Sequence, residues 1–240
     1  MANPLYGEIY RNHGTAWVFG RRAVGRVIGV PGRGTKSGSS ASGRARSPLS
    51  KSDISRLDAM TRGAPQVMVK IVSRTHNASQ LQRHIDYISR DAELPLESEY
   101  GPLQSKEEVG AVRASWIEQI KDQDAIEKNR RSAVSVNLML SMPQGTDRGQ
   151  FKQAVRDFVE TEFAGRHETL MAFHDDTDKP HAHIAVLARD YEGKSLNADR
   201  DRLDQWRDRF ASQLRDRGID ADATPRHARG VYVKGLHKTD

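Results

Sequence analysis

The sequence predicts an α+β fold in which a central antiparallel β-sheet is flanked by α-helices. Several segments alternate apolar and polar residues, as half-buried strands do. Others carry apolar residues at intervals of three and four, as amphipathic helices do. The order of these segments is strand, two helices, strand, helix, hairpin and helix. This order is typical of an antiparallel sheet with helices on one or both faces.

The bulk composition indicates a chain able to form one sizeable domain with an appendage. Its 240 residues are 36% hydrophobic, and no apolar run approaches the roughly 20 residues of a membrane span. The lack of cysteine excludes a disulfide framework, thiolate chemistry and a zinc finger. Arginines interrupt the apolar stretch near the N-terminus, unlike a secretory signal. We therefore expect a soluble, cytoplasmic protein with no membrane insertion.

Positive charge is concentrated in the first 64 residues. They hold eleven lysines and arginines but three acids, whereas the rest of the chain carries a small net negative charge. Residues 31–51 are rich in Gly, Ser and Arg, as a flexible linker is. The sequence thus predicts a basic, partly disordered extension over 1–64 and a globular domain over 65–240. A basic arm suits contacts with a phosphate backbone, and a merely solvated tail is the open alternative.

The globular part begins with a strand and a helix. The strand is the segment 66–72, QVMVKIV, and residues 73–77 are expected to end it. Asn77 is the expected N-cap of a helix over 78–91. The residues expected on the buried face of this helix are Leu81, Ile85 and Ile88.

Two further helices are separated by a strand. The first helix spans about 105–122, and the strand spans 133–141. Thr146 or Asp147 is expected to cap the next helix, over about 148–163. The residues expected to face the core are Val109, Val112, Trp116 and Ile120, then Val134, Val136, Leu138 and Leu140, then Phe151, Val155, Phe158 and Val159.

A final helix and a basic tail close the chain. Asn197 or Asp199 opens the helix, and Gly218 is expected to end it. Its apolar stripe consists of Leu203, Trp206, Phe210 and Leu214. In the tail, Arg226 and Arg229 are candidate phosphate contacts.

Three histidines in the predicted hairpin form a candidate metal site. His181 and His183 lie two residues apart on a strand, so both side chains face the same way, roughly 7 Å apart. His174 ends the preceding strand, and the six turn-forming residues between the strands would bring it alongside. Three neutral imidazoles leave coordination positions open, as catalytic metal sites do. Among the neighbouring acids Asp175, Asp176 and Asp178, we expect Asp176 to orient a ring N–H.

Two other interpretations of the histidines remain. A His-x-His pair on a strand also arises by chance. A histidine-triad nucleotide hydrolase carries three alternating histidines on one strand, but Ala185 stands at the third position here.

Four segments together resemble a known family. They are HIDYISRD over 84–91, LSMPQGTD over 140–147, the pattern HxDxxxPHxH over 174–183 and ATPRHARG over 223–230. In this order they resemble the conjugative relaxases of the MOBP class, which include the relaxases that nick T-DNA borders of tumour-inducing plasmids. The resemblance covers about Gln66 to Gly230. It implies an HUH-type endonuclease that nicks one strand at a plasmid's origin of transfer, and it identifies 65–240 as the relaxase domain.

The resemblance assigns expected roles to individual residues. Tyr87 matches the nucleophile, Ser141 the phosphate-contacting serine, and Asp176 the acid beside the metal-binding His174, His181 and His183. It further implies one divalent metal ion, with Mg or Mn in turnover and Zn, Co or Ni able to occupy the site in a crystal. The implied partners are single-stranded origin DNA, relaxosome accessory proteins and a type IV secretion coupling protein. The implied location is the bacterial cytoplasm, with transfer to the recipient cell along with the DNA.

The chemistry also follows from the residue types. A phenol has a pKa near 10, so forming the phenolate at pH 7 costs roughly 4 kcal/mol, which metal charge or a base must offset. Attack by Tyr87 would exchange one phosphodiester for another, so the reaction should be reversible. His84, one helical turn earlier, could act as a base, although a solvated histidine is the simpler interpretation. Asp86 is expected to face solvent, and a packed or surface tyrosine is the plain alternative for Tyr87.

Two further function classes stay open. A rolling-circle replication initiator would share the histidines and the tyrosine chemistry, but its tyrosine usually follows the histidines. A non-catalytic basic DNA-binding protein with a structural metal would bind DNA and leave it intact.

Overall fold

The computed structural model describes residues 54, 58–59, 61–126 and 132–224. Arg226, Arg229 and most of the basic extension, with its linker, therefore lie outside the described residues. No helix in the described ranges is both long enough and apolar enough to cross a membrane. The elements in chain order are β1 (Met68–Thr75), α3 (Ala78–Ser89), β2 (Leu96–Ser98), β3 (Gly101–Leu103), α4 (Lys106–Ile126), β4 (Ser135–Ser141), α5 (Arg148–Glu162), β5 (Thr169–His174), β6 (His181–Leu187) and α6 (Arg200–Asp216).

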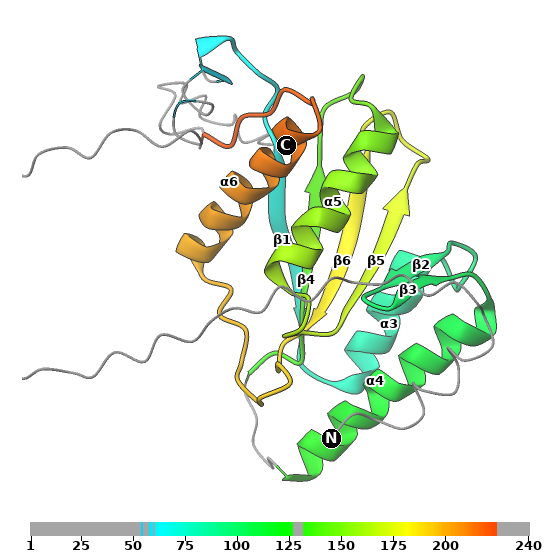
Figure 1. The fold of residues 1–240 in the computed structure, drawn as a ribbon. Helices are drawn as coiled ribbons and strands as arrows, with labels where there is room; N and C mark the ends of the chain where they lie inside the picture. The colour runs from blue at the N-terminus through cyan, green and yellow to red at the C-terminus, as the bar shows by residue number, and fades with distance from the viewer. Residues whose placement is uncertain (1–53, 55–57, 60, 127–131, 225–240) are drawn as a thin grey trace, which may run out of the picture. The chain divides into compact units, whose positions relative to one another are not determined.

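A single six-stranded sheet organises these elements (Figure 1). The strand order is β1-β4-β6-β5-β2-β3, and all neighbouring strands are antiparallel. The expected antiparallel α+β fold is therefore confirmed. The hairpin of β2 and β3 was not expected, because strands of three residues show no periodicity and Pro102 lies within the second. β1 also runs to Thr75 rather than ending at residue 72, with a bulge between Ile71 and Ser73.

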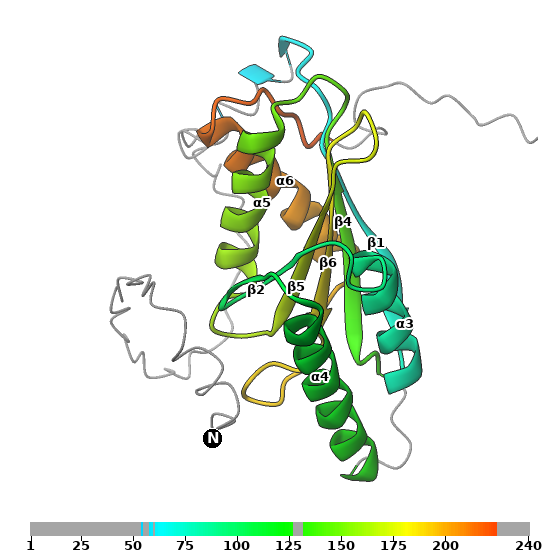
Figure 2. The same ribbon diagram turned by 90° about the vertical axis from the view of Figure 1, so that its right-hand side faces the viewer.

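Helices cover both faces of the sheet (Figure 2). α5 and α6 pack on one face, and α3 and α4 pack on the other. The first core combines helix residues such as Phe158, Trp206 and Phe210 with Val136, Leu138, Leu140 and Ile184 of the sheet. The second core combines Leu81, Ile85, Ile88, Trp116 and Ile120 with Leu170 and Ala185. Val134 was expected beside Val136, but it precedes β4 and packs in the second core.

Side-chain caps begin three helices where the sequence indicated. Asn77, Asp147 and Asp199 each accept a hydrogen bond from the backbone N–H three residues later. Gly218 follows α6 with a φ of 78°, the left-handed conformation that glycine adopts without a Cβ clash. Local chemistry therefore fixes where these helices begin and where α6 ends.

The packed part of the chain begins slightly before Pro65. Ala59 is buried, and Arg62 pairs with Asp220 at 3.0 Å. Gln66 then forms a parallel bridge with Asp222, beyond α6. Residues 62 and 66, on either side of the expected start of the domain, thus contact the segment that follows α6.

Candidate metal centre and active site

The register of β5 and β6 brings the three predicted metal ligands together. His174 lies directly opposite His181, and His183 is two residues along the same face. The ring centroids are 5.2 Å apart for His174 and His181, 4.9 Å for His174 and His183, and 5.7 Å for His181 and His183. One nitrogen from each ring lies within 4.8 Å of the others. This spacing lets one ion be shared after small ring rotations, since metal–imidazole bonds are about 2.0–2.1 Å long.

Backbone carbonyls occupy one nitrogen of two of these rings. Nε2 of His174 lies 2.9 Å from the carbonyl oxygen of Ile88, one of the last carbonyls of α3. Nδ1 of His181 lies 3.1 Å from the carbonyl oxygen of Lys179. Each carbonyl accepts the N–H of its ring, so the other nitrogen is the one that a neutral imidazole would offer to a metal. These carbonyls, rather than a carboxylate, orient the two rings.

His183 provides the test of whether a metal fits. Its side chain is buried, and Nδ1 has no hydrogen-bond partner in the described part of the chain. Burial and the neighbouring histidines lower the pKa of His183 to about 4, so the ring is neutral at pH 7. A neutral imidazole is the form that binds metal, and a buried nitrogen without a partner is unfavourable. The three residues present therefore fit a divalent cation.

Tyr87 stands beside this cluster and is open to solvent. It projects from the last turn of α3, its side chain is 65% exposed, and its ring meets that of His183 edge-on with 5.9 Å between centroids. Tyr87, His174 and His181 line one cavity of about 760 Å³. This exposure excludes the interpretation of Tyr87 as a tyrosine packed in the core.

Ser141 ends β4 directly opposite His181. It is buried, and its hydroxyl donates a long hydrogen bond of 3.4 Å to the Met142 carbonyl. The sheet therefore places Ser141 on the face that carries the histidines, next to His181.

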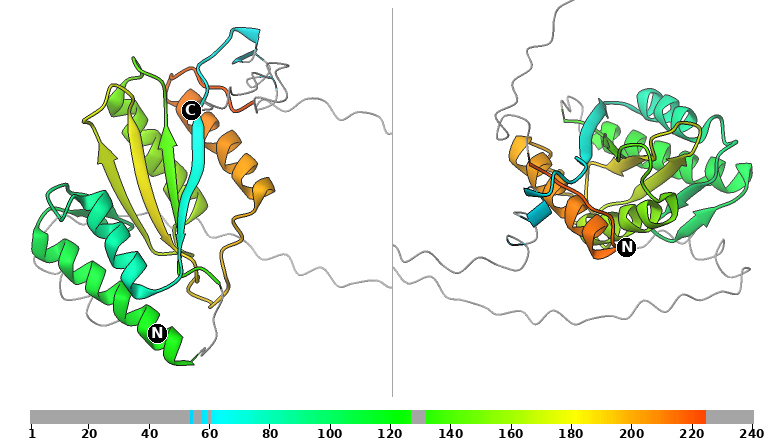
Figure 3. Two further views of the ribbon diagram at one scale, coloured as in Figure 1. Left: turned by 180° about the vertical axis from the view of Figure 1, so that it is seen from behind. Right: turned by 90° about the horizontal axis from the view of Figure 1, so that it is seen from above.

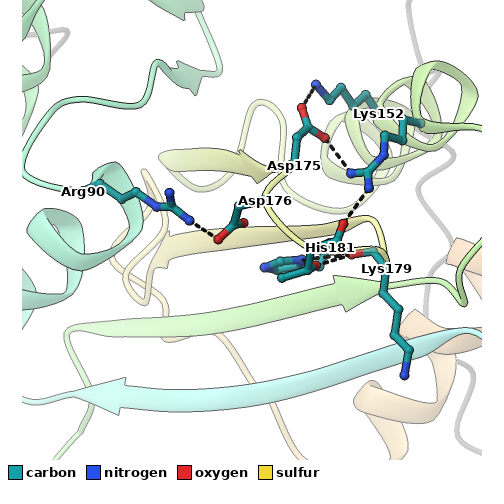
Figure 4. A network of polar contacts seen from close by, with 8 residues as sticks. Arg90, Lys152, Asp175, Asp176, Lys179 and His181 are labelled. Carbon is teal, nitrogen blue, oxygen red and sulfur yellow. Dashed lines mark hydrogen bonds and ion pairs between the residues drawn. The ribbon is translucent and has the colours of Figure 1, made fainter.

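Asp176 does not contact a histidine ring through a described hydrogen bond. Its carboxylate accepts a hydrogen bond from Arg90, which reaches across from the end of α3 to the β5–β6 turn (Figure 4). The Arg90 guanidinium holds the pKa of Asp176 below its usual range. We expected Asp176 to orient a ring N–H, but the Ile88 carbonyl does this for His174. Its neighbour Asp175 is bound instead by Arg148 and Lys152.

Comparison with known proteins gives the family. The model of the relaxase family, described as MobA/VirD2-like, nuclease domain, matches residues 87–219, which is more than half of the chain. The chain belongs to this family. The T-DNA border endonuclease VirD2 of Rhizobium radiobacter is 27% identical over 188 residues, covering 71% of this chain and 44% of that protein. VirD2 of Agrobacterium fabrum is 26% identical over 188 residues, covering 71% and 42%. The chain therefore spans less than half the length of these relatives.

One solved structure is also similar to this relaxase. Its title is "Molecular Basis of Vancomycin Resistance Transfer in Staphylococcus aureus". The two chains are 11% identical with a TM-score of 0.46, and the match covers 68% of this chain and 99% of that chain.

Two polar residues of the relaxase helix α3 differ from expectation. His84 is half-buried rather than solvated, and its Nε2 is buried without a hydrogen-bond partner in the described residues. Burial lowers the pKa of His84 to about 4. Its ring centroid is 6.5 Å from that of Tyr87, and its Nε2 makes no hydrogen bond to the phenol. Asp86 does not simply face solvent, because it pairs with Arg113 of α4.

The chain leaves α3 through three consecutive residues in the left-handed conformation. Arg90, Asp91 and Ala92 have φ angles of 49°, 55° and 62°, and none is glycine. This conformation costs about 1–2 kcal/mol for each residue with a Cβ. Sequence inspection gave no sign of it, since glycine or asparagine is the usual signal for a left-handed residue.

Beside the histidines, part of the sheet face is not covered by any helix that the structure describes. α3 and α4 lie over one corner of this face, and β6, β4 and β1 are visible beyond them (Figure 3). The β1 residues on this face include the exposed Met68 and Lys70, opposite Ser141 and Met139. An open surface that carries the Lys70 ammonium therefore adjoins the histidine cluster.

Proposed function

We propose that this relaxase nicks one DNA strand at a plasmid origin of transfer and can rejoin it. The observation that carries the proposal is the exposed phenol of Tyr87, edge-on to His183 within a cluster of three histidines. A nucleophile open to solvent and adjacent to a metal site suits attack on a phosphate that arrives from outside.

Tyr87 supplies the nucleophile in the proposed reaction. Its phenolic oxygen forms a bond to phosphorus, while the bond between phosphorus and the 3′ oxygen breaks in line. The phenolic proton passes to solvent, and the departing 3′ oxygen takes up a proton to become a hydroxyl. The DNA 5′-phosphate is then joined to Tyr87. Because one phosphodiester replaces another, the 3′-hydroxyl can attack the phosphotyrosine and restore the strand.

His174, His181 and His183 are the proposed ligands of one divalent ion, Mg or Mn in turnover. When bound, the ion would neutralise charge that develops on the non-bridging phosphate oxygens. Ser141, directly opposite His181, is the proposed donor of a hydroxyl proton to a phosphate oxygen. Asp176 is proposed to take part in the reaction indirectly, through its hydrogen bond with Arg90.

The proposed substrate and partners follow from the family. Single-stranded origin DNA is the substrate, and relaxosome accessory proteins and a type IV secretion coupling protein are partners. The relatives named above are bacterial T-DNA border endonucleases, which supports a bacterial cytoplasmic protein that travels with its DNA. We further propose residues 65–240 as the relaxase domain and 1–64, with Arg226 and Arg229, as contacts to the phosphate backbone.

The test is formation of a covalent protein–DNA adduct. Single-stranded oligonucleotides that span candidate origin sequences are incubated with the protein and Mn, Mg or EDTA, then separated on a denaturing gel. We expect an adduct that requires metal and disappears in Tyr87→Phe. Tyr100→Phe is the matched control, because Tyr100 is also a largely exposed tyrosine but lies at the β2–β3 turn.

Two outcomes would contradict the proposal. Cleavage without an adduct would remove Tyr87 as the nucleophile and indicate direct hydrolysis. Tight DNA binding without cleavage of any origin sequence would favour a non-catalytic DNA-binding protein.

A further inference from the structure

We propose that Arg90 binds a phosphate of the DNA strand beside Tyr87, and that Asp176 occupies its guanidinium in the free protein in place of that phosphate. The inference rests on the proposed function and adds a substrate contact to it. It follows from the position of Arg90, its backbone conformation and the character of its ion pair.

Position places Arg90 in the catalytic cavity. It follows Tyr87 by three residues, just beyond the end of α3, and both line the cavity that also contains His174 and His181. Figure 4 shows its guanidinium directed at Asp176 on the turn that leads into His181. A phosphate held between Tyr87 and the histidines would therefore approach the Arg90 side chain.

The backbone at Arg90 is held in a conformation that its side chain disfavours. Arg90 begins the left-handed segment described above, whereas the left-handed residue that follows α6 is a glycine, Gly218. Hydrogen bonds fix the segment, including Asp91 N–H to the Asp86 carbonyl at 2.8 Å and Leu94 N–H to the Ser89 carbonyl at 2.8 Å. Strained residues of this kind persist at functional sites when the surrounding structure holds them. Glycine would relieve the strain, so the presence of arginine indicates a use for its side chain.

The ion pair itself has little structural value. The Arg90 and Asp176 side chains are 43% and 45% exposed, and exposed pairs contribute little to stability. Two neighbouring acids form ion pairs with other side chains. Asp86 pairs with Arg113. Asp175 pairs with Arg148 and Lys152. Only Asp176 is paired with Arg90 among the described residues. A planar guanidinium matches the oxygens of a phosphate as well as those of a carboxylate, so DNA can replace Asp176.

Binding and catalysis can be tested separately. DNA affinity is measured by fluorescence anisotropy in a Tyr87→Phe background over a range of salt concentrations, and cleavage is measured with Tyr87 present. We expect Arg90→Gln to weaken affinity about 10- to 100-fold and to reduce the salt slope by about 0.7, the value for one phosphate contact on a single strand. Arg90→Lys should restore part of the affinity. Asp176→Asn should bind DNA more tightly, because a competing carboxylate is gone.

Two comparisons separate a DNA contact from a structural role. Arg90→Gly should keep or raise the melting temperature, since glycine accepts the positive φ, and yet lower affinity as Arg90→Gln does. Arg217→Gln is the matched control, because Arg217 also pairs with an acid, Asp157, but on the other side of the sheet. It should bind and cleave like the parent protein.

Contrary results are equally clear. If Arg90→Gln matches Arg217→Gln in affinity and salt slope, Arg90 does not contact DNA. If Arg90→Gln and Asp176→Asn lower the melting temperature and the affinity together, the pair is structural. If the parent protein binds DNA but never cleaves it, the proposed function fails, while the affinity series still decides the role of Arg90.

Discussion

His183 combines burial with a nitrogen that has no hydrogen-bond partner among the described residues. Its neighbours His174 and His181 each have one ring nitrogen bonded to a backbone carbonyl, and all three rings belong to one cluster. At the scale of single residues, the site thus consists of three clustered imidazoles, two of which are oriented by backbone carbonyls. Rings that are already oriented need little rearrangement to bind a metal ion.

Loss of one histidine should abolish most metal affinity. We expect His183→Ala to weaken Mn or Zn binding by at least about 100-fold, more than the loss of an outer-shell group does. Isothermal titration calorimetry measures the affinity, and the rise in melting temperature on adding metal should vanish as well. His76→Ala is the control, because His76 is exposed and lies outside the cluster. Equal affinity in both variants would show that the ion binds elsewhere.

Stability should fall in acid because two histidines are buried in the neutral form. Burial lowers the pKa of His84 and of His183 to about 4, whereas an unfolded histidine titrates near 6.5. Between these values the unfolded chain binds protons that the folded protein does not, so acid favours unfolding. Each histidine contributes on the order of 1–3 kcal/mol, fully present above pH 6.5 and lost by about pH 4.

Urea denaturation in EDTA at a series of pH values measures this effect. His84→Gln should flatten the profile between pH 6.5 and 4 relative to the parent protein. His76→Gln, at an exposed position, should leave it unchanged. An identical slope for the parent and His84→Gln would contradict the assignment of a buried neutral ring.

At the scale of elements, α3 connects the nucleophile to the metal centre. It carries Tyr87 on its exposed side and Leu81, Ile85 and Ile88 on its buried side, and the Ile88 carbonyl bonds to His174. The helix is therefore fixed in position by apolar packing and by a direct bond to a proposed metal ligand. A substitution at the start of α3 should therefore affect the stability of the helix that carries Tyr87.

The N-cap of α3 provides a prediction for this element. Asn77 accepts the backbone N–H of Gln80 at 2.9 Å, so Asn77→Ala should lower the free energy of unfolding by about 1 kcal/mol. Asn77→Ser should retain most of that stability, because serine is an equally good cap. Chemical denaturation monitored by circular dichroism measures both. A loss in the serine variant as large as in the alanine variant would rule out capping as the cause.

At the scale of the whole domain, the central strands lie between two apolar cores. β4 and β6 are buried along almost their whole length, and both strands contribute side chains to packed cores of the sheet. Residues of β6 then serve both layers, since Ile184 packs in the first core and Ala185 in the second. The histidines lie where β6 begins, at an end of a rigid central strand.

Truncation of a central side chain should be costly. Leu138 is fully buried in the middle of β4, so Leu138→Ala should lower the free energy of unfolding by about 2–5 kcal/mol. Leu203→Ala should cost clearly less, because Leu203 lies at the half-buried edge of the same core. Guanidinium denaturation measures both changes. Equal losses would mean that the two-layer packing is not what stabilises the sheet.

The sequence by itself determined the long elements and most of the site. Strand alternation and helical spacing identify every element of seven residues or more, and the caps Asn77, Asp147 and Asp199 mark helix starts. The hairpin motif was enough to place His174 beside His181 and His183, because strand geometry is local and periodic. Tyr87 could be selected only through the family pattern, since its spacing to the histidines is not local.

Tertiary structure alone decided the contacts between distant segments. Residues far apart in the chain form the bonds of Ile88 to His174 and of Arg90 to Asp176, and a backbone carbonyl leaves no mark in a sequence. The β2–β3 hairpin is too short to be periodic and exists because β5 offers it an edge to pair with. The left-handed turn at Arg90 likewise depends on the bonds around it rather than on its residue types. Local preference sets the elements, and the free energy of packing them together sets the site.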